Sequence, residues 1–257
     1  MEIVDTHSHL YLESFDDDRE QVIRNAINLG VNHFFIPAID SRYYSRMIEL
    51  KKLFPKNIYL MAGLHPCYVN EKYKQELKHL EDFLKSDNNF YAIGEIGIDL
   101  YRDNNNLDIQ EKVFDYQINI AKENNLPIVI HCRDAFDEVY RLLKSNFDDN
   151  LNGIFHCFTG TLDQAIKIID LNFKIGIGGV VTFKNGKIDK FLKEIPIKNI
   201  VLETDSPYLS PTPWRGKRNE SCNLIYIINK LSEIYGLSTK EICKQTTFNA
   251  KQVFKIL

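Results

Sequence analysis

The sequence has 257 residues and a formal net charge of −3, a length at which one barrel domain is common. Hydrophobic residues make up 44% of it and charged residues 26%, as in globular proteins that bury a large core. The acidic balance excludes nucleic-acid binding through bulk positive charge, so any polyanion must be bound locally.

Several other classes of protein are also disfavoured. The sequence contains no apolar run of the 18 or more residues expected of a transmembrane helix, and no secretory signal is recognisable at its start. The five cysteines form no CxxC pair, which argues against a disulfide framework or a structural zinc knuckle. We therefore expect a cytoplasmic protein without membrane association, and no obligate protein partner is evident.

Short apolar runs alternate with longer amphipathic segments along the chain. The runs are almost continuously apolar, as strands covered on both faces must be. The eight predicted strands span residues 3–6, 33–37, 58–63, 90–94, 127–130, 153–155, 173–176 and 200–203.

The amphipathic segments carry the spacing and the end signals of helices. Gly30 follows the first segment, Pro55 follows the second, and Ser238 to Glu241 form a capping box. The predicted helices span residues 19–29, 41–54, 70–86, 108–124, 135–146, 161–171, 187–194, 224–235 and 238–244, with a final segment toward residue 257.

Strands that alternate with helices predict a parallel sheet, because parallel neighbours need a crossover connection. Eight strands are the number that closes a TIM (β/α)8 barrel of the α/β class. The alternative, an open doubly wound sheet, more often has a glycine-rich loop after its first strand, where this chain has Thr6-His7-Ser8-His9. No linker or repeat is evident, so we expect a single domain over residues 1–257, with a loop at 103–106.

Polar side chains gather at the predicted carboxyl ends of the strands. In a barrel these ends meet at one mouth, where active sites are built. His7 and His9 are two residues apart and would project from the same side of a strand. The full set consists of His7, His9, His65, His131, His156, Glu95, Glu203 and Asp205.

Imidazole and carboxylate ligands suit zinc, manganese, cobalt, nickel or iron, and magnesium less naturally. The candidate ligands outnumber the three or four that one catalytic zinc uses. Two divalent ions sharing a bridging carboxylate, about 3.5–4 Å apart, are the simplest arrangement. Glu95, on a strand midway round the barrel, is the best candidate for the bridge. The charge of two cations exceeds that of three carboxylates, which favours an anionic substrate such as a phosphate ester.

Two further stretches are candidates for binding phosphate. The glycine-rich residues 176–179 follow the seventh strand and could cradle a phosphate or form a tight turn. Arg215, Lys217 and Arg218 follow the eighth strand beside Trp214, and they could bind phosphate from the active end of the barrel. Trp214 could stack on a base or pack its loop, and the sequence does not separate these roles.

Seven motifs, in order along most of the chain, together resemble the TatD family of metal-dependent deoxyribonucleases. Two departures are Cys67, at the rim of the mouth, and Ser221-Cys222, at the entry to the next helix. The motifs are Asp5-Thr6-His7-Ser8-His9, Gly63-Leu64-His65-Pro66, Gly94-Glu95-Ile96-Gly97-Ile98-Asp99, Pro127-Ile128-Val129-Ile130-His131, His156-Cys157-Phe158-Thr159-Gly160, Glu203-Thr204-Asp205-Ser206-Pro207-Tyr208-Leu209 and Arg215-Gly216-Lys217-Arg218-Asn219-Glu220.

The resemblance implies a TIM barrel with two metal positions that share one carboxylate. It also implies that His65 contacts the scissile phosphate or the leaving group and that Glu203 supports Asp205. Arg215, Lys217 and Arg218 would then bind the substrate. The implied ligands are His7, His9, Glu95 and Asp205 at one position and Glu95, His131 and His156 at the other.

These observations predict a divalent-metal-dependent phosphodiester hydrolase that acts on DNA by two-metal activation of water. Asp205 would receive the proton of the water, Glu95 would bridge the metals, and His65 would assist the departing oxygen. A barrel mouth admits single-stranded or frayed ends most easily, and the family resemblance suggests 3′→5′ exonuclease polarity. The alternatives are another metal-dependent hydrolase, acting on an amide, lactone or aminoacyl ester, and a non-catalytic metal-dependent binding protein.

Overall fold

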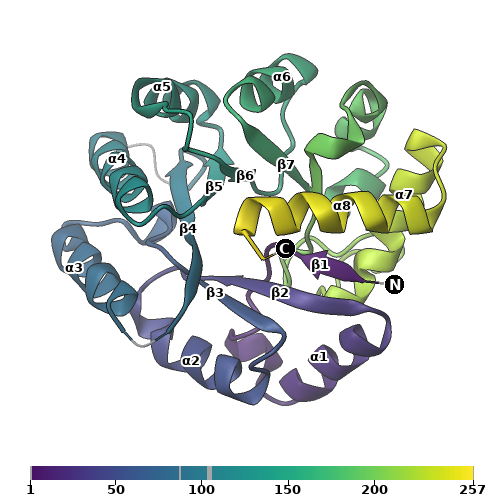
Figure 1. Ribbon diagram of the computed structural model, residues 1–257, viewed down its shortest axis with the longest axis horizontal. Helices are drawn as coiled ribbons and strands as arrows, with labels where there is room; N and C mark the ends of the chain where they lie inside the picture. Colours follow the sequence, from purple (N-terminus) through teal and green to yellow (C-terminus); the bar gives the residue numbers. More distant parts are fainter. Residues whose placement is uncertain (1, 87, 103–105, 257) are drawn as a thin grey trace.

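Eight parallel strands form a nearly closed barrel in the computed structural model, which describes residues 2–86, 88–102 and 106–256 (Figure 1). Each strand pairs with its neighbours in chain order. Backbone hydrogen bonds from Thr6 N to Leu202 O and from His9 N to Ser206 O join the last strand to the first. The predicted TIM barrel is therefore confirmed. The strands are β1 (Ile3–Asp5), β2 (Val31–Pro37), β3 (Ile58–Ala62), β4 (Phe90–Asp99), β5 (Ile128–Arg133), β6 (Gly153–Phe155), β7 (Phe173–Ile177) and β8 (Ile200–Leu202).

Most of the helices surround the barrel (Figure 1). The last helix, Thr239–Phe254, continues ten residues past its predicted end at 244, whereas the others agree with the predicted segments to within a few residues. Within the described residues, no helix is both long and apolar enough to span a membrane. The helices are α1 (Arg19–Asn28), α2 (Tyr44–Leu53), α3 (Tyr73–Leu84), α4 (Leu107–Glu123), α5 (Phe136–Asn146), α6 (Leu162–Asp170), α7 (Leu224–Tyr235) and α8 (Thr239–Phe254).

The predicted helix over residues 187–194 is wrong. The stretch forms two separate 3-10 turns, Ile188–Lys190 and Leu192–Glu194. Pro196 follows closely, and a segment this short gains too few hydrogen bonds to offset the cost of helix nucleation. Ile188 and Leu192 are still buried, so the apolar spacing reflected burial rather than an α-helix. The predicted loop at 103–106 lies, apart from Asn106, outside the described residues.

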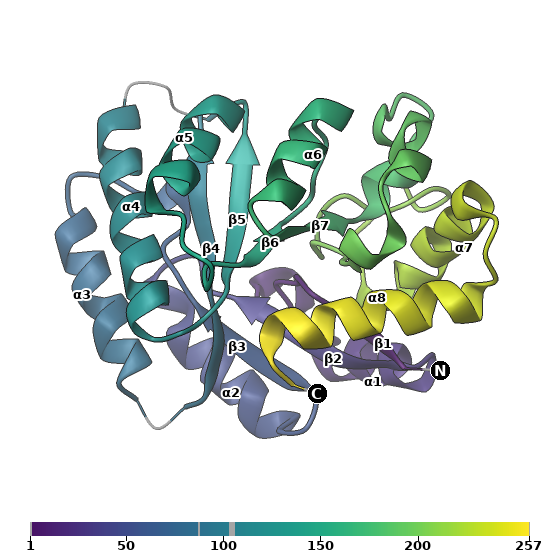
Figure 2. The same cartoon turned by 45° about the horizontal axis from the view of Figure 1, so that its top comes forward.

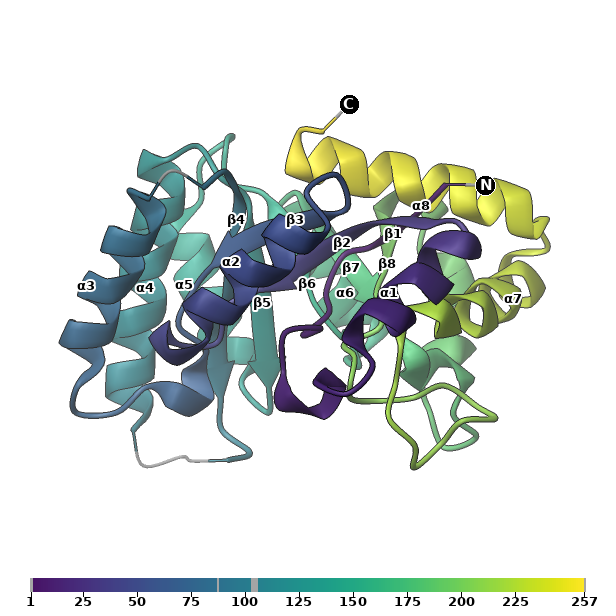
Figure 3. The same ribbon diagram turned by 90° about the horizontal axis from the view of Figure 1, so that it is seen from below.

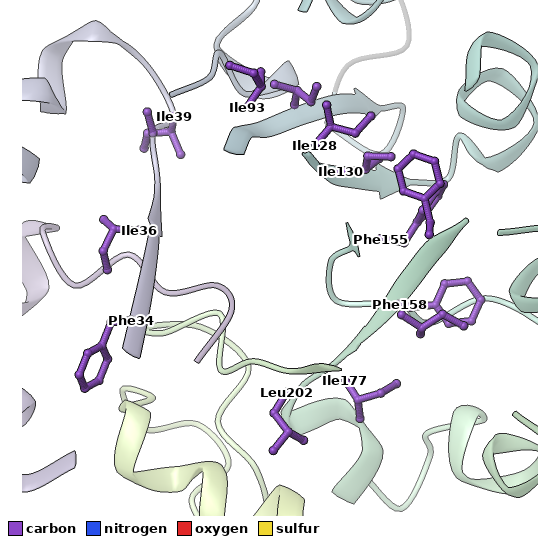
Figure 4. Close-up of a cluster of buried hydrophobic side chains, with 14 of the residues drawn as sticks. Phe34, Ile36, Ile39, Ile93, Ile128, Ile130, Phe155, Phe158, Ile177 and Leu202 are labelled. Atoms are coloured by element: carbon purple, nitrogen blue, oxygen red, sulfur yellow. The ribbon is translucent and has the colours of Figure 1, made fainter. Parts of the chain in front are cut away.

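The outer face of the barrel wall packs against the surrounding helices. Figure 4 shows Phe34, Ile36, Ile93, Ile130 and Phe155 among the side chains arranged round the wall, and all of them are buried. Burial of each such side chain stabilises the fold by roughly 1.5–3 kcal/mol. This demand on the outer face explains why the strands are nearly continuous apolar runs.

Helix α8 closes the amino end of the barrel, opposite the mouth. The ring of Phe254 stacks on Phe35 with 3.6 Å between the ring centroids. Asn249 Nδ2 donates hydrogen bonds to the carbonyl oxygens of Ile197 and Ile200, just before and at the start of β8. Figure 2 shows the arrow of β5 pointing away from α8, and Figure 3 shows α8 along one end of the barrel. The loops that follow the strands therefore meet at the other end.

Candidate metal centre

The carboxylate of Glu95, on β4, lies at the centre of the mouth between two pairs of histidines. Glu95 Oε2 is 3.2 Å from His7 Nε2 and 3.5 Å from His9 Nε2. Glu95 Oε1 is 2.8 Å from His131 Nδ1 and 3.2 Å from His156 Nε2. Each oxygen faces a different pair, which is the arrangement that a carboxylate needs in order to bridge two cations.

Asp205 adds a second carboxylate on the side of His7 and His9. Its Oδ1 lies 3.5 Å from His9 Nε2 and 3.8 Å from His7 Nε2. Burial opposes ionisation of Asp205, but its contact with His9 and the nearby imidazoles of His156 and His7 outweigh burial and lower its pKa. Asp205 is therefore an ionised oxygen donor at the mouth.

The seam between β8 and β1 holds these ligands in place. Asp205 N donates to His7 O over 2.9 Å, so the loop after β8 lies directly against the end of β1. The fully buried Asp5 accepts hydrogen bonds from Thr204 Oγ1 over 2.7 Å and from Ser221 Oγ over 2.6 Å. These bonds tie the first strand to the segment that carries Asp205.

His9 is oriented by a hydroxyl on the side away from Glu95. His9 Nδ1 is 3.0 Å from Tyr11 Oη, and that hydroxyl donates to Pro37 O over 2.9 Å. Because the Tyr11 hydroxyl donates its only proton to the carbonyl oxygen of Pro37, it must accept a hydrogen bond from His9 Nδ1–H. The lone pair of His9 Nε2 therefore points toward Glu95.

Two other histidines have carboxylates on the side away from Glu95. His131 Nε2 lies 2.8 Å from Asp99 Oδ2, and His156 Nδ1 lies 3.3 Å from Glu203 Oε1. The hydrogen bond between His131 and Asp99 fixes the tautomer of His131 and raises its basicity, a common arrangement for metal ligands. Among the described residues, His156 Nδ1 has only the ion-pair contact with Glu203. Burial opposes ionisation of Asp99, but its hydrogen bond with His131 outweighs burial and holds its pKa well below the usual range.

His65 also faces Glu95, but it presents a proton. Its Nε2 lies 3.2 Å from Glu95 Oε1, and its Nδ1 accepts a hydrogen bond from Cys67 N over 3.0 Å. A neutral imidazole that accepts at Nδ1 carries its proton on Nε2. The bond comes from the backbone of Cys67, so the departure from the family pattern at this position leaves it intact.

The donor set fits divalent cations. His7 Nε2 and His9 Nε2 lie only 3.2 Å apart, and buried imidazole and carboxylate donors suit zinc and its first-row neighbours. Burial opposes ionisation of Glu95, but the surrounding imidazoles of His65, His156 and His7 hold its pKa well below the usual range. Donor atoms within 4.8 Å of one another belong to three groups among the described residues: His7, His9 and Glu95; His7, His156 and Asp205; and His65, Glu95 and His131.

The glycines at 176–179 accommodate the protein's own chain. A Cβ on Gly176 would lie 2.3 Å from Glu203 Oε2, and a Cβ on Gly179 would lie 2.0 Å from Leu209 O. Glu203 is fully buried beneath this segment and accepts a hydrogen bond from Cys157 N. Close packing therefore accounts for these two glycines without a phosphate.

The basic run after β8 lies outside the mouth cavity. Arg218 is paired with Asp18 at 2.7 Å and with Glu220 at 2.8 Å. Arg215 lies over the ring of Phe183 at 3.5 Å, and Lys217 lies over Trp214 at 5.2 Å. None of these three cations lines the cavity formed by the described residues, and their role in substrate binding stays a prediction.

The cavity at the mouth has a volume of about 630 Å³. Some of the residues around it were not among the candidates predicted from the sequence. Arg102 and Arg133 line it beside Asp99, while Tyr11 supports His9 from behind. Two of the missed residues could have been found by strand alternation, because Arg133 lies two positions after His131 on β5 and Asp99 lies four positions after Glu95 on β4. Tyr11 lies in a turn and Arg102 follows the end of β4, so this pattern does not identify them.

Comparisons with known proteins show the family and the fold of this chain. A family model described as TatD-related DNase matches residues 4–255. The metal-dependent hydrolase YabD of Bacillus subtilis is 39% identical over 255 residues, which cover 99% of each chain. The crystal structure of YjjV, a TatD homologue from Escherichia coli, superposes with a TM-score of 0.93 at 27% identity, covering 99% of this chain and 98% of the other. A TatD-family hydrolase from Entamoeba histolytica shares the fold, with a TM-score of 0.89 at 22% identity over 99% of this chain and 98% of the other.

Proposed function

The chain belongs to the TatD-related DNase family of metal-dependent hydrolases, and from that premise we propose that it hydrolyses phosphodiester bonds of DNA. The observation that carries the proposal is the Glu95 carboxylate, whose two oxygens face two different pairs of histidines. A pair of divalent cations suits phosphoryl transfer because it neutralises charge on both the attacking and the leaving oxygen.

We assign the metal ligands as two sets that share Glu95. When bound, the cations supply Lewis-acid stabilisation of the phosphoryl oxygens and make a neighbouring water more acidic. The first set is His7, His9, Glu95 and Asp205, and the second is Glu95, His131 and His156, as the contacts of each Glu95 oxygen suggest.

Asp205 acts as the general base in this proposal. Its carboxylate is ionised, and its side chain is 14% exposed at the mouth, whereas that of Glu95 is only 3% exposed. A water that enters the cavity can therefore reach Asp205 and transfer a proton to it. Glu203 was expected to support Asp205, but its carboxylate lies 3.3 Å from His156 Nδ1, and it is fully buried and does not meet the substrate.

His65 acts as the hydrogen-bond donor. Because its Nδ1 accepts from Cys67 N, its Nε2–H points into the same space as Glu95 Oε1. A donor aimed there can stabilise charge on a phosphoryl or departing oxygen. The tautomer favours this role over that of a metal ligand.

The size of the mouth cavity favours the end of a single strand as substrate. A cavity of about 630 Å³ at the end of the barrel lies within the range of small-ligand sites, so a free or frayed terminus reaches Glu95 more easily than an internal duplex segment. We propose 3′→5′ exonuclease polarity, which rests on the family resemblance.

A nuclease assay tests the proposal. Purified protein is incubated with manganese or zinc and with single-stranded oligonucleotides labelled at either the 5′ or the 3′ end. A 5′ label is expected in a ladder of progressively shorter products, and a 3′ label in released mononucleotide. Asp205→Asn is the inactive control.

Three results would count against the proposal. Intact DNA together with turnover of lactones or aminoacyl esters would indicate another hydrolase at the same site. DNA retention without products, equal in wild type and Asp205→Asn, would indicate a binding protein. A 3′ label retained on shortening products would reverse the polarity.

A further inference from the structure

The mouth cavity has two chemically different arcs. Its apolar and aromatic residues come from the loops that follow β8, β1, β2 and β3, which are consecutive around the barrel. Its two arginines come from the neighbouring strands β4 and β5: Arg102 follows β4, and Arg133 ends β5. The apolar arc consists of Leu12, Ile39, Tyr68, Tyr208 and Leu209.

Arg133 is placed by strand alternation. It lies two residues after His131 on β5, so both side chains leave the same side of the strand. Two residues advance an extended strand by roughly 6.6 Å, which places Arg133 farther out along the mouth than the group that His131 contacts. The Arg133 guanidinium lies over the Tyr101 ring at 3.7 Å, and this stacking holds its plane without using its hydrogen-bond donors.

The backbone of Arg102 is fixed by a hydrogen bond. Its amide donates to Asp99 Oδ1 over 2.8 Å, so the side chain leaves the main chain next to the residue that supports His131, and it lines the cavity. Within the described residues, neither Arg102 nor Arg133 forms a side-chain hydrogen bond or ion pair. By contrast, Arg42 and Arg218 have carboxylate partners in Asp40 and Asp18.

We propose that Arg102 and Arg133 bind the phosphate next to the one that is cleaved, while the apolar arc accepts the base of the terminal nucleotide. The inference rests on the proposed function and adds a subsite to it. A guanidinium matches phosphate oxygens in a bidentate manner. Aromatic and aliphatic side chains accept any base, because every base has an apolar face. The basic residues that serve DNA would then be these two arginines rather than Arg218, whose donors are already occupied.

The test asks whether the preference for a charged neighbouring phosphate depends on Arg133. The substrates are the trinucleotide TpTpT and an analogue in which the linkage that is not cleaved first is a neutral methylphosphonate. The variants are Arg133→Gln and the double variant Arg102→Gln/Arg133→Gln. The matched control is Arg24→Gln, because Arg24 also lies over an aromatic ring, that of Phe54, but on helix α1.

Wild type and Arg24→Gln are expected to prefer TpTpT over the neutral analogue by roughly 10- to 100-fold in kcat/KM, as for a hydrogen bond to a charged group. Arg133→Gln is expected to reduce that preference several-fold, mainly through KM, and the double variant should nearly abolish it. Turnover of bis(p-nitrophenyl) phosphate, which has no second phosphate, shows that each variant is folded and tests the diesterase activity separately.

The possible results separate the two proposals. An unchanged preference in the double variant would overturn the arginine subsite while leaving the diesterase function intact. The absence of any preference in wild type would also overturn it. If the metal-loaded wild type cleaves neither TpTpT nor bis(p-nitrophenyl) phosphate, the proposed function fails and the subsite fails with it.

Discussion

The two ends of the barrel interior use neighbouring positions on the same strands for opposite purposes. On β5, Val129 belongs to the apolar cluster at the amino end, and His131 lies two residues farther on, against Glu95. Ile154 and His156 repeat the pattern along β6 and beyond its end. A step of two residues on the inner face of a strand therefore separates two regions. One is the apolar cluster at the amino end, which includes Phe35, Val129, Ile154 and Phe254 and is called the plug below. The other is the mouth with the candidate metal ligands.

The two ends of the barrel contribute differently to the stability of the folded state. The amino end buries apolar side chains, including Phe254 of α8, and this removes them from water at no electrostatic cost. The mouth gathers five largely buried imidazoles around Glu95, and buried polar groups cost free energy unless they are well paired. Burial of the plug therefore offsets the free-energy cost of burying polar groups at the mouth. Bound cations should further stabilise the folded state.

Glu95→Gln should produce the largest effect and test the mouth alone. The amide keeps the shape but cannot bridge two cations, so we expect DNA hydrolysis to fall by at least about 10³-fold, beyond the loss of a single oxyanion donor. Metal analysis should find fewer bound equivalents than in wild type. Near-normal activity, with the fold confirmed by circular dichroism, would remove the bridging role.

Phe254→Ala should test the plug alone. Loss of the ring stacked on Phe35 should lower the free energy of unfolding by about 3–5 kcal/mol, measured by urea denaturation. Below the transition, kcat/KM should stay within twofold of wild type. Phe248→Ala is the matched control, because Phe248 lies on the same helix but is 46% exposed, and it should change stability by less than about 1 kcal/mol. A large loss of activity in folded Phe254→Ala would show that the two ends are coupled.

Asp99→Asn should have the smallest effect of the three substitutions. It tests whether a residue behind a candidate ligand contributes to the site at the mouth. Removing the charge behind His131 should weaken metal binding or activity by about 10- to 100-fold, measured by metal titration and by the nuclease assay. Asp134→Asn is the control, since Asp134 lies one residue beyond β5 and is exposed. Equal effects of the two substitutions would indicate a general charge effect rather than orientation of His131.

The sequence was sufficient to predict the number and order of the strands and the convergence of the candidate ligands, because both depend on local pattern. The predicted end of the fourth strand at residue 94 is wrong, because β4 continues to Asp99 and contains Glu95. Because the carboxyl ends of the strands meet at one mouth in any barrel, the sequence alone was enough to predict that His7, Glu95 and His131 lie close together. Partners from distant segments could not be found this way. The pairing of Arg218 with Asp18, 200 residues earlier, depends on where loops fold back. The tautomer of His65 depends on one backbone amide, which no residue type specifies.

The seam between β8 and β1 links the first ligands of the chain to the last. His7 and His9 precede Asp205 and its anchors Thr204 and Ser221 by about 200 residues. Because Asp205 joins the other predicted ligands only when β8 closes against β1, a nascent chain from which this segment has not yet emerged holds most of the predicted ligands without the proposed base. The candidate site is therefore assembled only after β8 has been synthesised and has closed against β1.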